Sequence, residues 1–151
     1  MWLETIREIS GFGGNPIYIA VMLSFLFTNH FSEFTYLFAA IIFAYAIVIA
    51  IRFTFWTKRP DYKTKPKNIW EKFDEGSFPS MHVIRAIMLA VVISFFFSNI
   101  IITITTIVAV LLVSWSRIYL NRHYLRDVLV SVPIGLVIIW LTIKHIAPIF
   151  L

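Results

Sequence analysis

Long uncharged stretches dominate the chain. Four of them cover residues 9–29, 34–51, 86–116 and 128–143. The third would be about 46 Å long as one helix, whereas the hydrocarbon core of a bilayer is about 30 Å thick. Ser98 and Asn99 lie near its middle and favour a turn, so this stretch predicts two helices. The pattern therefore predicts five membrane spans, at residues 15–30, 34–56, 80–97, 100–121 and 125–147.

The N-terminal residues have a different pattern. Trp2, Ile6 and Ile9 lie along one side of a helix and the charged residues lie elsewhere, which is typical of a short helix in the membrane interface. The glycine-rich segment 11–16 then interrupts the helix. Its glycines do not match a dinucleotide fingerprint, so we interpret the segment as a flexible joint. We expect one membrane-embedded domain over residues 1–151, with an interfacial helix and joint at 1–14 and a loop at 57–79.

Composition supports this interpretation. The chain has 151 residues, of which 60% are hydrophobic and only 14% are charged, against about 25% charged residues in soluble domains. The sequence therefore predicts an all-α, polytopic transmembrane helix bundle. The chain contains no cysteine, which excludes disulfides, thiolate catalysis and thiolate metal sites.

The basic residues gather on one face of the predicted bundle. With five spans, all but one of the 13 Lys and Arg residues lie on the same side of the membrane, and the exception is Lys144. The positive-inside rule would place this side in the cytoplasm. Nucleic-acid binding is not expected, because this charge lies at a bilayer surface and no binding module accompanies it.

Residues 116–127 place Ser116, Arg117, His123 and Asp127 between two apolar segments. His123 and Asp127 are four residues apart, so on a helix their side chains share one face. A carboxylate in contact with an imidazole fixes its tautomer, as a nucleophile or base requires. The pair could also bind a metal ion, but the neighbouring arginines suit an oxyanion better.

A second group of candidates follows the second predicted span. Arg52 and Arg59 are seven residues apart, so two turns of helix would direct both toward the same face, and Pro60 then turns the chain into the loop. The alternative is that both arginines only anchor the end of the span at the membrane interface.

The third group opens the next span, at residues 78–82. Ser80 occupies a helix N-cap position, and helix N-termini bind anions through free N–H groups. His82 lies on the first turn, where it can give a proton to a leaving group, and Arg85 shares its side of the helix. The alternative is an ordinary cap followed by an interfacial histidine. Because the three groups converge on one face, together they predict a phosphate pocket.

These residues resemble the three motifs of the type 2 phosphatidic acid phosphatase superfamily, in the form of a small bacterial or archaeal member. Its pattern is K-x6-R-P, then P-S-G-H, then S-R-x5-H-x3-D. The third motif is complete here, at Ser116, Arg117, His123 and Asp127. Arg52 replaces the lysine of the first motif, and Met81 replaces the glycine of the second. We expect Arg52 to shift the phosphate and Met81 to make the pocket tighter or more apolar.

The resemblance implies a hydrolysis in two steps without metal or cofactor. His123 would attack phosphorus while Asp127 orients it, and His82 would protonate the leaving oxygen and then activate water. Phosphate would be held by the residues Arg52, Arg59, Ser80, Met81 and Arg117. Since His82 must be protonated while His123 is neutral, a bell-shaped pH profile is expected.

By resemblance, the substrate is a membrane lipid carrying a phosphate or pyrophosphate. The candidates are polyprenyl pyrophosphates, phosphatidylglycerophosphate, phosphatidic acid and the 1-phosphate of lipid A. Many relatives act outside the cytoplasm, so we place the site on the outer side of the cell (inner) membrane, against the positive-inside rule. A non-catalytic scaffold, a small transporter and a vanadate-dependent haloperoxidase remain as alternatives.

Overall fold

The computed structural model describes residues 2–61, 68 and 76–146. Its helices are α1 (Trp2–Gly11), α2 (Asn15–Phe27), α3 (Phe31–Thr54), α5 (Met81–Phe97), α6 (Ile100–Tyr119) and α7 (Leu125–Leu141), and a π-helical turn, η1 (Thr142–Ile146), follows α7. Within the described residues the only β pairing is an isolated bridge between Lys58 and Gly76. The all-α prediction is therefore confirmed. Most of the expected loop at 57–79, namely 62–67 and 69–75, lies outside the described residues.

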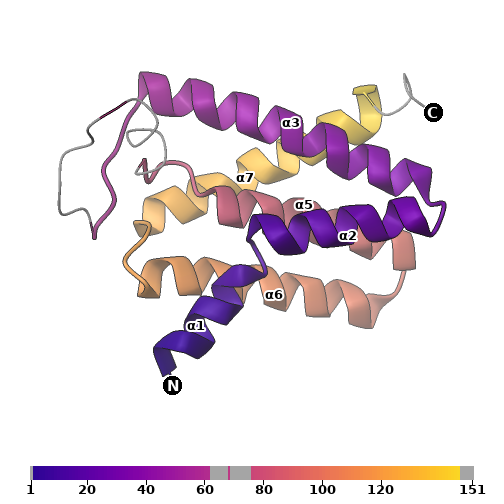
Figure 1. The fold of residues 1–151 in the computed structure, drawn as a ribbon, viewed down its shortest axis with the longest axis horizontal. Helices are drawn as coiled ribbons and strands as arrows, with labels where there is room; N and C mark the ends of the chain where they lie inside the picture. Colours follow the sequence, from indigo (N-terminus) through magenta and orange to yellow (C-terminus); the bar gives the residue numbers. More distant parts are fainter. Residues whose placement is uncertain (1, 62–67, 69–75, 147–151) are drawn as a thin grey trace.

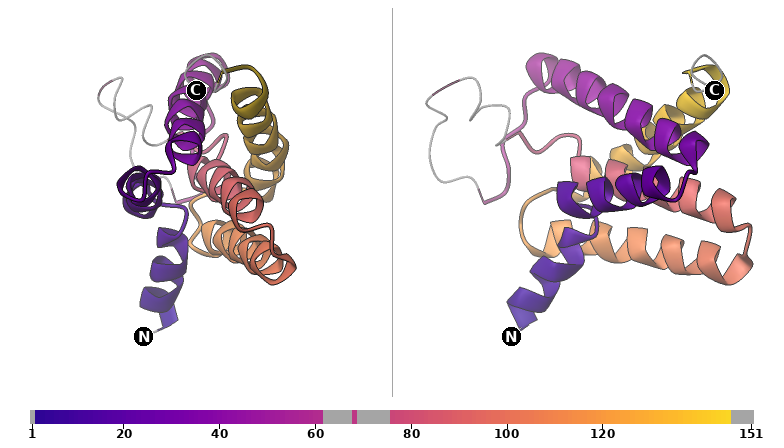
Figure 2. Two further views of the ribbon diagram at one scale, coloured as in Figure 1. Left: turned by 90° about the vertical axis from the view of Figure 1, so that its right-hand side faces the viewer. Right: turned by 45° about the vertical axis from the view of Figure 1, so that its right-hand side comes forward.

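The helix α5 is the centre of the bundle. The helices α2, α3, α5, α6 and α7 run alongside one another, and α1 slants away from them (Figure 1). In the end-on view of Figure 2, α5 lies between α2, α3, α6 and α7, and it contacts all four. Nine of its 17 residues are buried, among them Ile84, Met88 and Val92. These side chains form the core together with Ala40 and Ala44 of α3, whose small size lets the two helices approach closely.

The helices differ in whether each is long enough by itself to cross a membrane. Three described helices are long and apolar enough to cross a membrane: Phe31–Thr54, Ile100–Tyr119 and Leu125–His145. The helices α1 and α2 meet at an angle of 41° and could form a fourth span only as a bent pair. Alone, α2 has 13 residues, or about 20 Å, which is too short for a hydrocarbon core of about 30 Å. The helix α5 also falls short, with 17 residues.

The predicted turn between α5 and α6 is confirmed. Ser98 has a left-handed backbone, with φ of 46°. Asn99 is the N-cap of α6, and its side-chain oxygen accepts hydrogen bonds from the N–H groups of Ile101 and Ile102. A cap of this kind satisfies amide groups that the first turn of a helix leaves free. This turn and the connection from α2 to α3 lie at one end of the bundle, opposite the end where α3 ends and α5 begins (Figure 1).

Candidate active site

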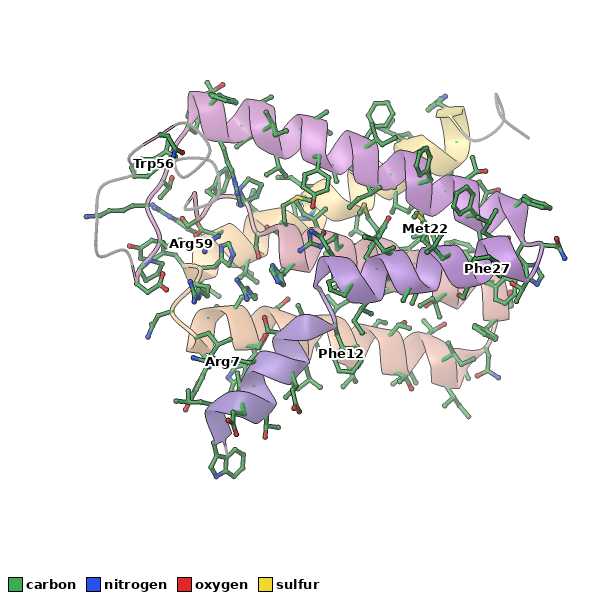
Figure 3. All side chains as sticks on the ribbon, in the orientation of Figure 1. Arg7, Phe12, Met22, Phe27, Trp56 and Arg59 are labelled. Atoms are coloured by element: carbon green, nitrogen blue, oxygen red, sulfur yellow. The ribbon has the colours of Figure 1, made fainter. Side chains whose placement is uncertain are left out.

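The motif residues come together at one end of the bundle. There α3 ends, α5 begins, α6 ends and α7 begins (Figure 1). Figure 3 shows nitrogen-bearing side chains concentrated at this end, where Arg7 and Arg59 are labelled. Three segments that are far apart in sequence therefore contribute to one region, as the sequence predicted.

The link between α6 and α7 places His123 beside Asp127. Asn121 has φ of 53°, which reverses the chain, and the N–H of Arg122 donates to the carbonyl of Arg117 over 3.1 Å. The N–H of Tyr124, the N-cap of α7, donates to Oδ2 of Asp127 over 3.0 Å. Nδ1 of His123 lies 3.9 Å from the same oxygen. His123 precedes α7, so the prediction that both side chains share one helix face is wrong; the linking turn brings them together.

The surroundings of His123 favour a neutral ring. Its side chain is 2% exposed, and the carboxylate of Asp127 is fully buried. Burial lowers the pKa of His123 and the hydrogen-bonding influence of Asp127 raises it, while the charges of Arg117 and Arg59 lower it further. The resulting pKa is below the ordinary histidine value. Nδ1 is the ring nitrogen that lies beside Asp127, and at 3.9 Å it is buried without a hydrogen-bond partner in the described structure.

The first motif is divided by the end of α3. Arg52 lies in the last turn, is 6% exposed, and donates from Nη2 to the carbonyl of Pro79 over 3.1 Å. Arg59 lies beyond Thr54, where α3 ends. The prediction that two turns of one helix carry both arginines is therefore wrong. Arg52 instead supports the chain that leads into α5.

The segment that carries Arg59 is held against neighbouring chain. The N–H of Ser77 donates to the carbonyl of Thr57 over 2.8 Å. The N–H of Asp61 donates to the carbonyl of Asn121 over 3.2 Å, and its carboxylate pairs with Arg122 at 3.1 Å. These contacts bring the first motif to the third.

The second motif forms the N-terminus of α5. Ser80 is the N-cap, as predicted, but its hydroxyl makes no capping bond and is buried without a partner in the described structure. Its N–H donates over 2.8 Å to Oγ of Ser131, whose hydroxyl donates to the Asp127 carbonyl over 2.5 Å. Ser131 thus connects the second and third motifs. Met81 is 7% exposed and packs into the apolar core.

A polar pocket of about 500 Å³ opens between these segments. It is lined by Arg7, Ser10, Gly11, Arg59, Asp61, His82, Arg117, Leu120 and Arg122. One residue from each motif takes part: Arg59, His82 and Arg117. The other predicted site residues are not part of this lining. Guanidinium groups that converge on a partly enclosed space suit an anion with several oxygens.

Several contacts in this region have no counterpart in the sequence prediction. Nη1 of Arg117 donates to Oγ of Ser10 over 2.7 Å, so α1 contributes to the site. Ser77 is buried beside both His123 and Asp127. Ser131 follows Asp127 by four residues, a spacing that could have drawn attention to it. No pattern links Ser10 to Arg117, since 107 residues separate them.

Among the residues that the structure describes, no group of three His, Cys, Asp or Glu side chains is arranged to hold a metal ion. The pair formed by His123 and Asp127 has arginines around it rather than further metal ligands. The donor set around the pocket thus suits an oxyanion.

Comparisons with known proteins agree with this geometry. The PAP2 superfamily matches residues 33–148 of the chain. Among solved structures, the crystal structure of Aquifex aeolicus LpxE is similar, with a TM-score of 0.78 and 23% identity over 95% of this chain and 86% of that one. This likeness shows a shared fold. No curated protein matches the sequence significantly. The chain, a membrane-type helix bundle with the three motifs at one end, therefore belongs to the PAP2 superfamily.

Proposed function

We propose that this protein hydrolyses a lipid phosphate or lipid pyrophosphate through a phosphohistidine intermediate, without a metal ion. One observation supports this most directly: Arg59, His82 and Arg117 line one pocket, and His123 is buried next to them beside a carboxylate. The backbone N–H of His123 also donates to the backbone carbonyl of Arg117 over 3.2 Å, which joins the residue of the nucleophile to a residue that lines the pocket.

In the first step, Nε2 of His123 attacks phosphorus. A P–N bond forms as the bond between phosphorus and the lipid oxygen breaks, and the departing oxygen takes a proton from His82. The imidazole gains positive charge during the attack, and the carboxylate of Asp127, 3.9 Å from Nδ1, stabilises it. The neutral ring favoured by the low pKa of His123 is the form that can attack.

In the second step, water attacks the same phosphorus. The P–N bond breaks, and His82 takes a proton from the water. Inorganic phosphate leaves, and both histidines return to their starting states. One histidine therefore serves as acid and then as base, as microscopic reversibility allows.

Phosphate oxygens have several donors to bind. Arg59 and Arg117 face the pocket, and the N-terminus of α5 supplies the N–H of Met81. The buried hydroxyl of Ser80 is a further donor at this helix end. Arg52 does not line the pocket, but its guanidinium, which donates to the carbonyl of Pro79, contributes positive charge near the start of α5. Together they offset the charge of the transferring phosphoryl group.

A lipid substrate fits the position of the pocket at the ends of apolar helices. Its phosphate would occupy the polar end while its tail stays in the bilayer.

We place the site on the outer side of the cell membrane. Because the chain has no cysteine, single labels test this directly: a membrane-impermeant thiol reagent applied to whole cells should modify Lys65→Cys and not Ser98→Cys. The opposite labelling pattern would place the site in the cytoplasm.

Phosphate release from purified lipid phosphates and pyrophosphates tests the proposal. Activity should persist in EDTA, and labelled phosphate should be trapped on the wild-type protein as an acid-labile, alkali-stable adduct. His123→Ala should remove both the activity and the adduct. Activity that survives in His123→Ala, or that EDTA abolishes, would contradict the mechanism.

A further inference from the structure

Two arginines outside the three motifs line the polar pocket. Of the arginines in its lining, Arg59 and Arg117 belong to the motifs, whereas Arg7 and Arg122 do not. Arg7 lies on α1, before residue 33, where the family match begins. Arg122 lies in the link between α6 and α7. The hydrolysis proposed above uses neither of these two side chains, so their presence in the pocket needs an explanation.

The motif arginines lie close to the reacting groups. The charges of Arg59 and Arg117 interact with both His82 and His123. Together with the N–H groups at the start of α5, these guanidinium groups can surround a phosphate whose phosphorus lies within reach of His123. One phosphate group therefore has enough donors from the motifs alone.

Arg122 is held at the rim of the pocket. Its backbone N–H donates to the carbonyl of Arg117 over 3.1 Å, and its Nη1 pairs with Oδ2 of Asp61 at 3.1 Å. Its side chain is 47% exposed. Because a guanidinium has several N–H groups, the pair with Asp61 can fix its orientation and still leave other N–H groups to bind an anion.

Arg7 approaches the pocket from α1. Its side chain is exposed, and Figure 3 shows it apart from Arg59 at the same end of the bundle. Leu3, one helical turn before Arg7, is also exposed. An anionic group bound by Arg7 would therefore lie next to apolar surface that the start of a lipid tail can follow.

The charge of the pocket exceeds what one phosphate group needs. Among the described residues of the lining, four arginines and the carboxylate of Asp61 give a net charge of +3 when His82 is neutral. A phosphate monoester carries about two negative charges at neutral pH, and a second phosphate linked to it adds about one more. The volume of about 500 Å³ is also far larger than a single phosphate group. Charge and volume thus fit a substrate with two linked phosphates.

We infer that Arg7 and Arg122 form a second phosphate subsite, and that the preferred substrate is a lipid pyrophosphate rather than a lipid monophosphate. The inference rests on the proposed function and selects between the two substrate classes that it includes. His123 attacks the terminal phosphorus, and a P–N bond forms there as the bond from that phosphorus to the bridging oxygen breaks. The bridging oxygen takes the proton of His82 and leaves as part of the lipid phosphate. Arg7 and Arg122 bind this leaving phosphate and offset the charge that develops on it.

Two substrates with the same tail, hexadecyl pyrophosphate and hexadecyl phosphate, test the subsite. The wild type should hydrolyse the pyrophosphate with a kcat/KM about tenfold or more above that for the monophosphate, and hexadecyl phosphate should accumulate as the product. Arg7→Gln and Arg122→Gln should each lower kcat/KM on the pyrophosphate about tenfold, the effect of one hydrogen bond to a charged group, and on the monophosphate less than about threefold. Both side chains are exposed, so neither change should prevent folding.

Arg126→Gln is the matched control. It also removes a cation at this end of the bundle, but the side chain of Arg126 is 68% exposed and does not line the pocket. It should change kcat/KM on both substrates equally and by less than about threefold. A selective loss on the pyrophosphate in Arg126→Gln as well would mean that general positive charge, rather than a subsite, sets the preference.

Equal losses on both substrates in Arg7→Gln and Arg122→Gln would overturn the second subsite, as would a wild type that hydrolyses the monophosphate as efficiently as the pyrophosphate. The proposed function is judged separately. It stands if the wild type hydrolyses either substrate and His123→Ala hydrolyses neither, even where the monophosphate is preferred. If the wild type hydrolyses neither substrate, the proposed function fails and the pyrophosphate subsite fails with it.

Discussion

Asp127→Asn removes the negative charge next to the proposed nucleophile and preserves the size of the side chain. Oδ2 lies 3.9 Å from Nδ1 of His123, and both side chains are buried. At an effective dielectric constant near 20, two unit charges at this separation interact by about 4 kcal/mol. Since about 1.4 kcal/mol corresponds to a factor of ten in rate, kcat should fall by about 10³-fold.

The pH profile provides a second readout for the same variant. The carboxylate of Asp127 raises the pKa of His123 against the dominant effect of burial. Without that charge the pKa of His123 should fall further, so the ring stays neutral to a lower pH. The acidic limb of kcat/KM should therefore move to lower pH in Asp127→Asn, even though the rate is reduced.

Arg126→Gln is the matched control. Nε of Arg126 lies 3.6 Å from Oδ1 of the same carboxylate, but the arginine side chain is 68% exposed. Because solvent screens an exposed charge, this change should alter kcat less than about threefold. A kcat for Asp127→Asn within tenfold of wild type, with an unmoved acidic limb, would refute the assigned role of the carboxylate.

Three further predictions concern the same end of the bundle. In the wild type, the lowered pKa of His123 should place the acidic limb of kcat/KM below the ordinary histidine value of about 6.5, with activity lost as pH falls through that limb. Ser10→Ala removes the 2.7 Å bond to Arg117 and should lower kcat/KM on a lipid phosphate about tenfold, since a bond to a charged group contributes about 1.5 kcal/mol. Gly13→Ala should destabilise the protein by about 1–3 kcal/mol in a denaturation assay because its Cβ meets the His82 carbonyl, whereas Gly11→Ala, with nothing within 4 Å, should change stability much less.

The N-terminal helix deserves a functional interpretation in its own right. It precedes the part of the chain that the family match covers, yet Ser10 contacts Arg117, and Arg7 and Gly11 line the pocket. The joint that follows it holds Arg85. We therefore expect changes in this helix to affect phosphate handling as well as membrane association. Measuring the activity of Ser10→Ala at saturating and at limiting substrate separates an effect on phosphate handling from an effect on membrane association.

The sequence alone determined the class of this protein, because apolar length and charge depletion depend on composition and not on tertiary contacts. It also identified the motif residues, because their order and spacing are local properties of the chain. Of the five predicted spans, three correspond to helices that are by themselves long and apolar enough to cross a membrane, whereas α2 and α5 are shorter. A helix that other helices surround need not satisfy the length rule for an isolated span.

Only the tertiary structure decided how the site is assembled. His123 meets Asp127 through the turn at Asn121, and Arg59 reaches the pocket from beyond the end of α3. Periodicity predicts which residues share a helix face, but it does not predict where a helix ends or how a loop folds back. The contact of Ser10 with Arg117 joins residues 107 positions apart, and that of Gly13 with Arg85 joins residues 72 positions apart. Such pairs depend on how the helices pack against one another, and no local pattern in the chain encodes that packing.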